Sequence, residues 1–169
     1  MGNIISTELL KIKRYSVVKA GLVMMSLSVL MSCFYSTAST NKVWDFQYFI
    51  QQVIISNCTL FFPIIITLVA VYIISRETTD DTLKSILTVP ISYKKLLIAK
   101  FWLLLFLTIV FSIFNALLSI CFNAFLGFSG MNIHMMLMSA AQIIVSDILV
   151  YISVPVSYTH LRAHETEAD

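Results

Sequence analysis

The sequence predicts an all-α, polytopic integral membrane protein with about four transmembrane helices. Its 169 residues are 59% hydrophobic, and the mean hydropathy is +0.89. Only 12% of the residues are charged, whereas soluble domains carry about 25%. The charges are clustered, so the apolar runs between them exceed the roughly 20 residues that a helix needs to cross a bilayer.

The chain begins with a short mixed segment, residues 1–14, followed by the first apolar run. Ile5, Leu9 and Ile12 fall near one helical face of the segment, which predicts an interfacial helix lying on the bilayer surface. The first span is predicted at 17–35, with a short polar loop after it.

A second apolar run, residues 46–75, contains thirty residues and no formal charge. This is longer than one span requires, and we place the span itself at 53–75. Pro63 is expected to kink or loosen the helix, because proline lacks a backbone N–H. Polar residues in the first half are expected to lie in the interface or to face other helices: Gln47, Gln51, Gln52 and Asn57.

The third apolar run, residues 101–146, has forty-six residues without Asp, Glu, Lys or Arg. A helix of that length would extend about 69 Å, roughly two hydrocarbon thicknesses, so the chain must fold back once. The glycines of the segment 127–132 indicate the turn. Two spans follow from this, at 101–125 and 135–156.

Between the second and third spans lies a charged island, residues 76–100, which contains eight of the twenty formally charged side chains. Thr78 and Asp81 have the spacing of a capping box, and Pro90 is expected to end the helix that they start. Leu83, Ile86 and Leu87 share one face of this helix. A water-exposed helix with an apolar stripe favours a docking element over a simple linker.

The distribution of Lys and Arg predicts the orientation. Nine of the eleven lie either before residue 20 or in the island, and only Lys42 lies in the loops on the other side. Basic residues concentrate on the cytoplasmic side of membrane proteins. The N-terminus and the loop 76–100 are therefore expected in the cytoplasm, and residues 36–46 and 127–134 outside.

The island resembles the first cytoplasmic loop of type 2 ABC exporter permeases, in the run from Ile74 to Lys95 and in Ala99-Lys100. The opening run from Ile4 to Lys13 is similar to their N-terminal interfacial helix, and the resemblance covers residues 1–156. The subgroup it most resembles is the bacitracin-resistance and lantibiotic-protection permeases of Gram-positive bacteria. The resemblance implies a cell-membrane protein with six spans, of which this chain has about four.

The resemblance also implies the partners. The permease would pair with a second permease copy or a paralogue in the lipid bilayer, and with a separate ABC ATPase subunit. The island would form the coupling helix that docks into that ATPase. By position, the contact would be made by Glu77, Asp81, Leu83, Lys84, Ile86 and Leu87.

The implied function is ATP-driven export of an amphipathic antibiotic or peptide-like substrate. The chain has only four glycines and no phosphate-binding loop, so the partner subunit would use the ATP and this chain would bind no cofactor. No catalytic residue and no nucleic-acid partner are expected. An alternative is a non-transporting membrane anchor or assembly protein. An intramembrane enzyme would need a cluster of reactive groups at one depth, and we find only the isolated Asp147 and His134.

Asp147 is the one carboxylate inside a predicted span. Ionisable residues in membrane spans are costly and often functional. The structural alternative is a carboxylate that faces a polar crevice or pairs with Ser139, with Gln142 or with a further helix. Both interpretations stay open at the level of sequence.

The composition changes abruptly to polar residues at Ser157. This predicts that residues 157–169 are a non-native tail and that the native chain continues with more spans. His160 and His164 in this segment have the i, i+4 spacing of zinc ligands on a helix. With no third ligand evident, no metal site is expected.

Overall fold

The computed structural model describes residues 16–38, 45–79 and 93–167, with side chains described for 16–38, 45–73 and 98–153. Four helices in these ranges are long and apolar enough to cross a membrane, which confirms the predicted all-α polytopic fold. Their spans are Ser16–Ala38, Phe46–Ile73, Ile98–Leu126 and Ile133–Ser153.

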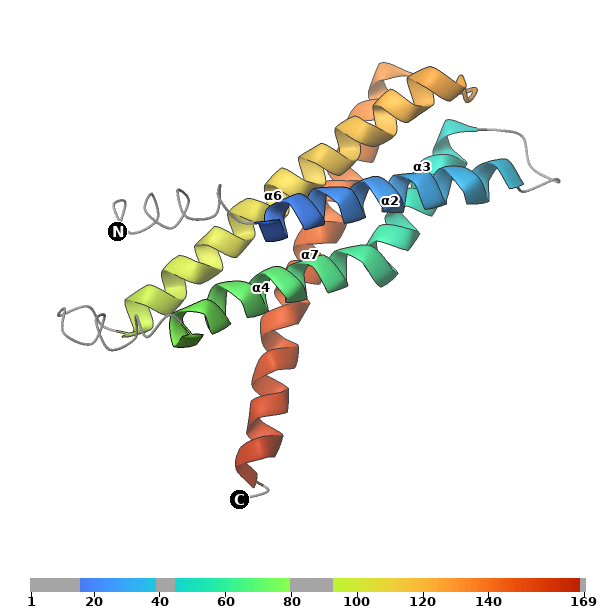
Figure 1. Ribbon diagram of the computed structural model, residues 1–169. Coiled ribbons are helices and arrows are strands. Elements are labelled where there is room, and N and C mark those ends of the chain that lie inside the picture. The colour runs from blue at the N-terminus through green and yellow to red at the C-terminus, as the bar shows by residue number, and fades with distance from the viewer. Residues whose placement is uncertain (1–15, 39–44, 80–92, 168–169) are drawn as a thin grey trace.

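Figure 1 shows how the helices are arranged. Helix α2 (Ser16–Ala38) and helix α4 (Phe62–Thr79) lie beside α6 (Tyr93–Leu126), and α7 (Ile133–Glu167) passes behind them. The start of α2, the end of α4 and the start of α6 lie toward one end of the bundle. Both segments that flank residues 80–92 therefore leave the bundle at the same end.

The second span is longer than predicted and is built from three helical sections. Helix α3 (Phe46–Ser56) begins well before residue 53, and a π-helical turn η1 (Asn57–Phe61) joins it to α4 without a break. The amide of Phe62 donates to the carbonyl oxygen of Asn57, five residues earlier. Because Pro63 has no N–H to continue the α-helical ladder, the loosening expected at this residue takes the form of the π turn.

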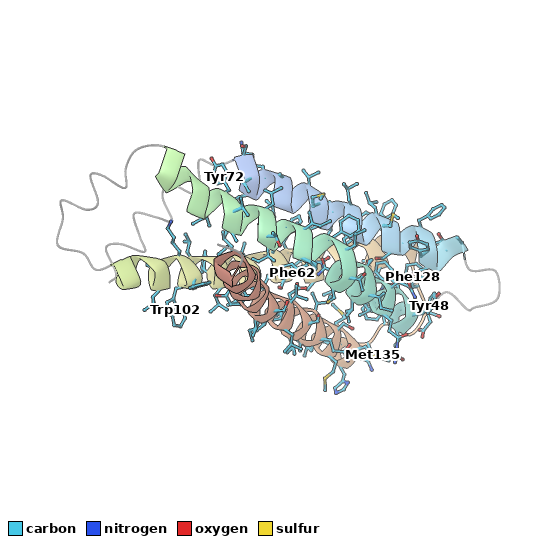
Figure 2. All side chains as sticks on the ribbon, turned by 90° about the horizontal axis from the view of Figure 1, so that it is seen from below. Tyr48, Phe62, Tyr72, Trp102, Phe128 and Met135 are labelled. Atoms are coloured by element: carbon cyan, nitrogen blue, oxygen red, sulfur yellow. The ribbon has the colours of Figure 1, made fainter. Side chains whose placement is uncertain are left out.

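Two apolar clusters form the core. The larger one joins α2, α4 and α6 around Met25, Phe62 and Phe111, each fully buried. The smaller one joins α2, α3, α6 and α7, and in it Phe49 stacks on Phe128 at 5.2 Å between ring centroids. The outward side chains are also apolar; Trp102 is 60% exposed and points away from the bundle (Figure 2). An apolar exterior is what contact with lipid requires.

The turn predicted around Gly127 is confirmed. Gly127 and Gly130 have φ angles of 70° and 83°, a conformation that glycine adopts without steric cost. The amide of Phe46 donates to the carbonyl oxygen of Ser129 at 3.0 Å, so the turn is held against the start of α3. A Cβ atom at Gly130 would lie 2.7 Å from Asp45 Oδ1, so another residue would have to displace the Asp45 side chain as well as adopt a strained backbone.

The ends of α6 and α7 extend beyond the predicted spans. Helix α6 begins at Tyr93, so the last third of the charged island is continuous with the third span. Lys100, in that part of α6, donates from Nζ to the carbonyl oxygen of Ile73 at 3.1 Å and so joins α6 to α4. Helix α7 continues to Glu167, past the composition change at Ser157; the origin of residues 157–169 stays a prediction.

Candidate functional site

Most residues of the predicted docking helix lie outside the described part of the chain: Asp81, Leu83, Lys84, Ile86 and Leu87. Glu77 falls in the last turns of α4, where the backbone alone is described. The end of α4 and the start of α6, which flank this segment in the sequence, lie at the same end of the bundle (Figure 1). Their predicted role in docking is developed below as a proposal.

Asp147, by contrast, is fully described, and it lies at the centre of a buried polar cluster. Its side chain has no exposed surface. Asn57 Nδ2 donates to Asp147 Oδ1 at 2.7 Å, and Ser112 Oγ lies 2.7 Å from Asp147 Oδ2. The partners that we had considered, Ser139 and Gln142, are not used: Ser139 donates instead to the carbonyl oxygen of Met135.

Three spans meet at this carboxyl group. Asn57 is the first residue of the π turn, Ser112 lies midway along α6, and Asp147 lies in the second half of the fourth span. A π turn holds an extra residue per turn, so it changes which side chains of the following helix face inward. Asn57 is 1% exposed, which shows that the turn presents its amide to the interior.

Ser112 belongs to a polar stripe that the sequence analysis missed. The stripe is buried along one face of α6 and consists of Thr108, Ser112, Asn115, Ser119 and Asn123. Its spacing of three and four residues inside an uncharged run is the signal that could have revealed it. The carboxamide of Asn115 has no hydrogen-bond partner for either its nitrogen or its oxygen among the described residues.

A second polar row lies on α2, where Ser28, Ser32 and Ser36 are buried. Ser32 Oγ donates to the carbonyl oxygen of Ser28 at 2.8 Å and lies 2.6 Å from Ser56 Oγ on α3. Small hydroxyl side chains let membrane helices approach closely and satisfy one another. This row therefore explains how α2 packs on α3.

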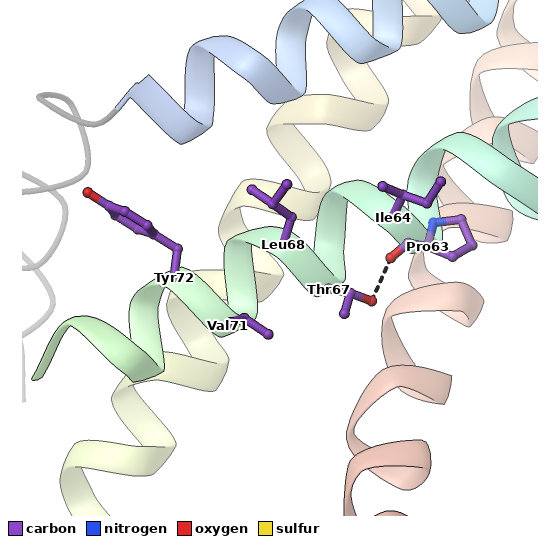
Figure 3. A pocket seen from close by; sticks show the side chains of 6 residues that line it. All are labelled: Pro63, Ile64, Thr67, Leu68, Val71 and Tyr72. Carbon is purple, nitrogen blue, oxygen red and sulfur yellow. Dashed lines mark hydrogen bonds between the residues drawn. The ribbon is translucent and has the colours of Figure 1, made fainter. Parts of the chain in front are cut away.

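A groove lies on the outer surface of α4, and all of its lining side chains come from that helix (Figure 3). It measures about 650 Å³ and is lined by Pro63, Ile64, Thr67, Leu68, Val71 and Tyr72. The Thr67 hydroxyl donates to the carbonyl oxygen of Pro63 at 2.6 Å. Ile64, Leu68 and Val71 are each at least 43% exposed, so we interpret the groove as a lipid-facing surface.

A smaller and more polar hollow, of about 100 Å³, lies between α3 and α7. Three amide side chains line it, from Gln47, Gln51 and Gln142. These glutamines are exposed on the bundle surface although their helices are long enough to span a membrane. Amides at this depth need hydrogen-bonding partners, so the hollow is suited to a ligand that carries amide groups.

The comparisons with known proteins give one match. A family model described as ABC-2 family transporter protein matches residues 4–161, which is nearly the whole chain. No match is found among curated proteins or among solved structures.

Proposed function

This chain belongs to the ABC-2 transporter family and is a multi-pass membrane permease subunit of an ABC transporter, and we propose that it works as an exporter driven by a separate ATPase subunit. The family match over residues 4–161 carries the proposal. We also propose that the chain lies in the cell membrane with a cytoplasmic N-terminus, next to a second permease copy or a paralogue.

The ATPase contact is proposed for the loop 76–100. Its predicted apolar stripe of Leu83, Ile86 and Leu87 needs a partner surface, and the basic residues around it favour the cytoplasm. The end of α4 and the start of α6, which this loop connects, lie at one end of the bundle. A force that the ATPase exerts on the loop would therefore act on the second and third spans together. Glu77, Asp81 and Lys84 would form the polar rim.

The transport step is proposed as a rocking of the first three spans between inward-open and outward-open arrangements. The π turn η1 supports this, because π turns inside helices are frequent at functional sites and supply a place where a span bends. ATP would be consumed in the partner, and this chain would perform no covalent chemistry.

An amphipathic antibiotic or peptide-like substrate is proposed on two grounds. The resemblance of the island favours it, and so does the hollow between α3 and α7. Its amide side chains match the donors and acceptors of a peptide backbone, and the thioethers of Met135 and Met138 adapt to varied apolar groups.

The docking of the loop is tested with Ile86→Glu. A charge in the middle of the apolar stripe should abolish co-purification with the ATPase and its stimulated ATP hydrolysis, while the permease still inserts. The matched control is Ser85→Glu, which adds the same charge on the opposite helical face. Truncating Leu83 or Leu87 to Ala should weaken docking several-fold to thirtyfold, as expected for about 1–2 kcal/mol.

The alternative of a non-transporting anchor or assembly protein predicts a different result. Such a protein would insert normally and would show no ATPase that depends on residue 86. If Ile86→Glu retained full co-purification and stimulated hydrolysis, the docking assignment would be wrong.

A further inference from the structure

The contacts of Ser112 beside Asp147 bear on whether the carboxyl group of Asp147 carries a proton. Ser112 Oγ lies 2.9 Å from the carbonyl oxygen of Thr108 and 2.7 Å from Asp147 Oδ2. Both of these neighbours are acceptors when the carboxyl group is ionised, whereas a serine hydroxyl has a single hydrogen to donate. One hydrogen shared between both acceptors would make two bent and weaker bonds, so two contacts this short favour a second hydrogen supplied by one of the partners.

The hydroxyls of this protein favour the backbone. Thr108, Ser119 and Ser139 each donate to the carbonyl oxygen four residues earlier, at 2.7 to 3.0 Å. Ser32 does the same while it also contacts Ser56 across the helix interface. Ser112 in the same arrangement donates to Thr108 and has lone pairs left to accept a hydrogen bond. The hydrogen in its contact with Asp147 then comes from the carboxyl group.

Among the residues whose side chains are described, no positive charge lies beside Asp147 to balance an ionised carboxylate. In the part of the chain described, Lys100 is bonded to the carbonyl oxygen of Ile73 and lies about three helical turns from Ser112 along α6. Lys19 lies in the first turn of α2. The titratable neighbours are uncharged: Cys58 is hydrogen-bonded to Ser146, and Tyr151 donates to the carbonyl oxygen of Phe101. An unbalanced buried charge is very costly, and a carboxyl group avoids the cost by binding a proton.

We propose that Asp147 is a proton-binding site in the centre of the permease. The proton sits on Oδ2 and is donated to Ser112 Oγ, whose own hydrogen goes to the carbonyl oxygen of Thr108. Asp147 Oδ1 then acts as a carbonyl oxygen and accepts from Asn57 Nδ2, as observed at 2.7 Å. A 2.7 Å separation is typical of an O–H···O hydrogen bond, so the geometry needs no adjustment.

The site gives the bundle a chemical switch. The proton is held while the π turn, α6 and α7 are packed together around Asp147. When the spans separate and water enters, the carboxyl group ionises and the hydrogen bond to Ser112 is lost. Proton release would then accompany opening, and proton binding would accompany closure.

Infrared spectroscopy of the full-length chain tests the proposal directly. At neutral pH the protein should show the carbonyl stretch of a protonated carboxylic acid. Asp147→Asn should lose this band. The matched control is Asp45→Asn, which removes a carboxyl group at the start of α3 and should keep the band. Absence of an acid band from the unmodified protein at neutral pH would overturn the proposal, as would its persistence in Asp147→Asn.

Two further measurements keep the test decisive if Asp147→Asn does not fold. Ser112→Ala removes the acceptor, so the acid band should shift to higher frequency; an unchanged band would contradict the assignment.

The pH dependence of unfolding supplies the second measurement. The native state holds a proton that an aspartate in water has lost above about pH 4. Stability should therefore fall as the pH rises from about 4 to the pH at which the native carboxyl group ionises, by up to tenfold in the unfolding equilibrium per pH unit. A flat profile would count against the proton.

Discussion

At the scale of single residues, the structure shows that Asp147 faces the interior of the bundle, while its functional role stays a proposal. The carboxyl group is fully buried, and it joins Asn57 and Ser112, which come from two other spans. Sequence reasoning identified the residue because a carboxylate inside a span is rare. It could not identify the partners, because Asn57 lies ninety positions away and local patterns do not fix how three helices rotate against one another.

Two substitutions of similar size at Asp147 should show how much its hydrogen bonds contribute to stability. Asn keeps one acceptor for Asn57 and one donor for Ser112, so Asp147→Asn should change the unfolding free energy by less than about 1 kcal/mol. Leu keeps neither, and Asp147→Leu leaves the Asn57 amide buried without a partner. This should cost about 1–3 kcal/mol in thermal unfolding in detergent.

The contrary result is equally clear. If Asp147→Leu were as stable as the unmodified protein and expressed better, then the carboxyl group would be merely tolerated at its position. Loss of transport by both variants at normal expression would show instead that the carboxyl group itself is needed for activity.

At the scale of helices, the apolar runs predict where spans exist but not how far each helix extends. The second span was expected from residue 53, whereas α3 begins at Phe46. The glutamines of that region are compatible with an interface or with a face toward other helices, and Gln47 and Gln51 line a hollow between α3 and α7. Pro63 was correctly expected to disturb the helix. A proline at position 63 does not by itself predict a π turn before it. Whether the helix forms a π turn depends on which helical face must bury Asn57.

The contact of α2 with α4 and α6 depends on the small size of Gly21. A Cβ atom at this position would lie 2.7 Å from Phe111 Cζ and 3.3 Å from Ile65 Cγ2. Both neighbours are buried, so a larger side chain has little space. Gly21→Leu should therefore destabilise the protein by roughly 1–3 kcal/mol, the range that is typical of overpacked cores.

The matched control for Gly21→Leu is Val23→Leu on the same helix. Val23 is 60% exposed, and its substitution should leave the Tm in detergent within error. If Gly21→Leu were equally silent, the close approach of α2 to Phe111 would not contribute to stability.

At the scale of the whole molecule, hydropathy was sufficient to predict the fold class. A long apolar segment in lipid must satisfy its own backbone N–H and C=O groups by hydrogen bonds, and an α-helix does this within the segment. Four long apolar helices in the described ranges agree with that expectation. The docking surface depends on a different kind of information. Its stripe of Leu83, Ile86 and Leu87 is an inference from helical spacing and from the family. Its proposed function is to bind a partner chain.

The orientation of the whole molecule is the last prediction. The start of α2 and the flanks of residues 80–92 lie at one end of the bundle, so they must lie on one side of the membrane. The excess of Lys and Arg there predicts the cytoplasm. Single cysteines can test this after replacement of Cys33, Cys58 and Cys121.

In intact cells, an impermeant thiol reagent should label Thr40→Cys, in the loop that the sequence predicts to lie outside, and His134→Cys, at the opposite end of the bundle. It should label Ser85→Cys only after permeabilisation. His134 is exposed at the start of α7, so access to its position is not limited by packing. Labelling of Ser85→Cys in intact cells would invert the topology. It would also remove the proposed ATPase contact, because the loop would then face away from the compartment that holds ATP.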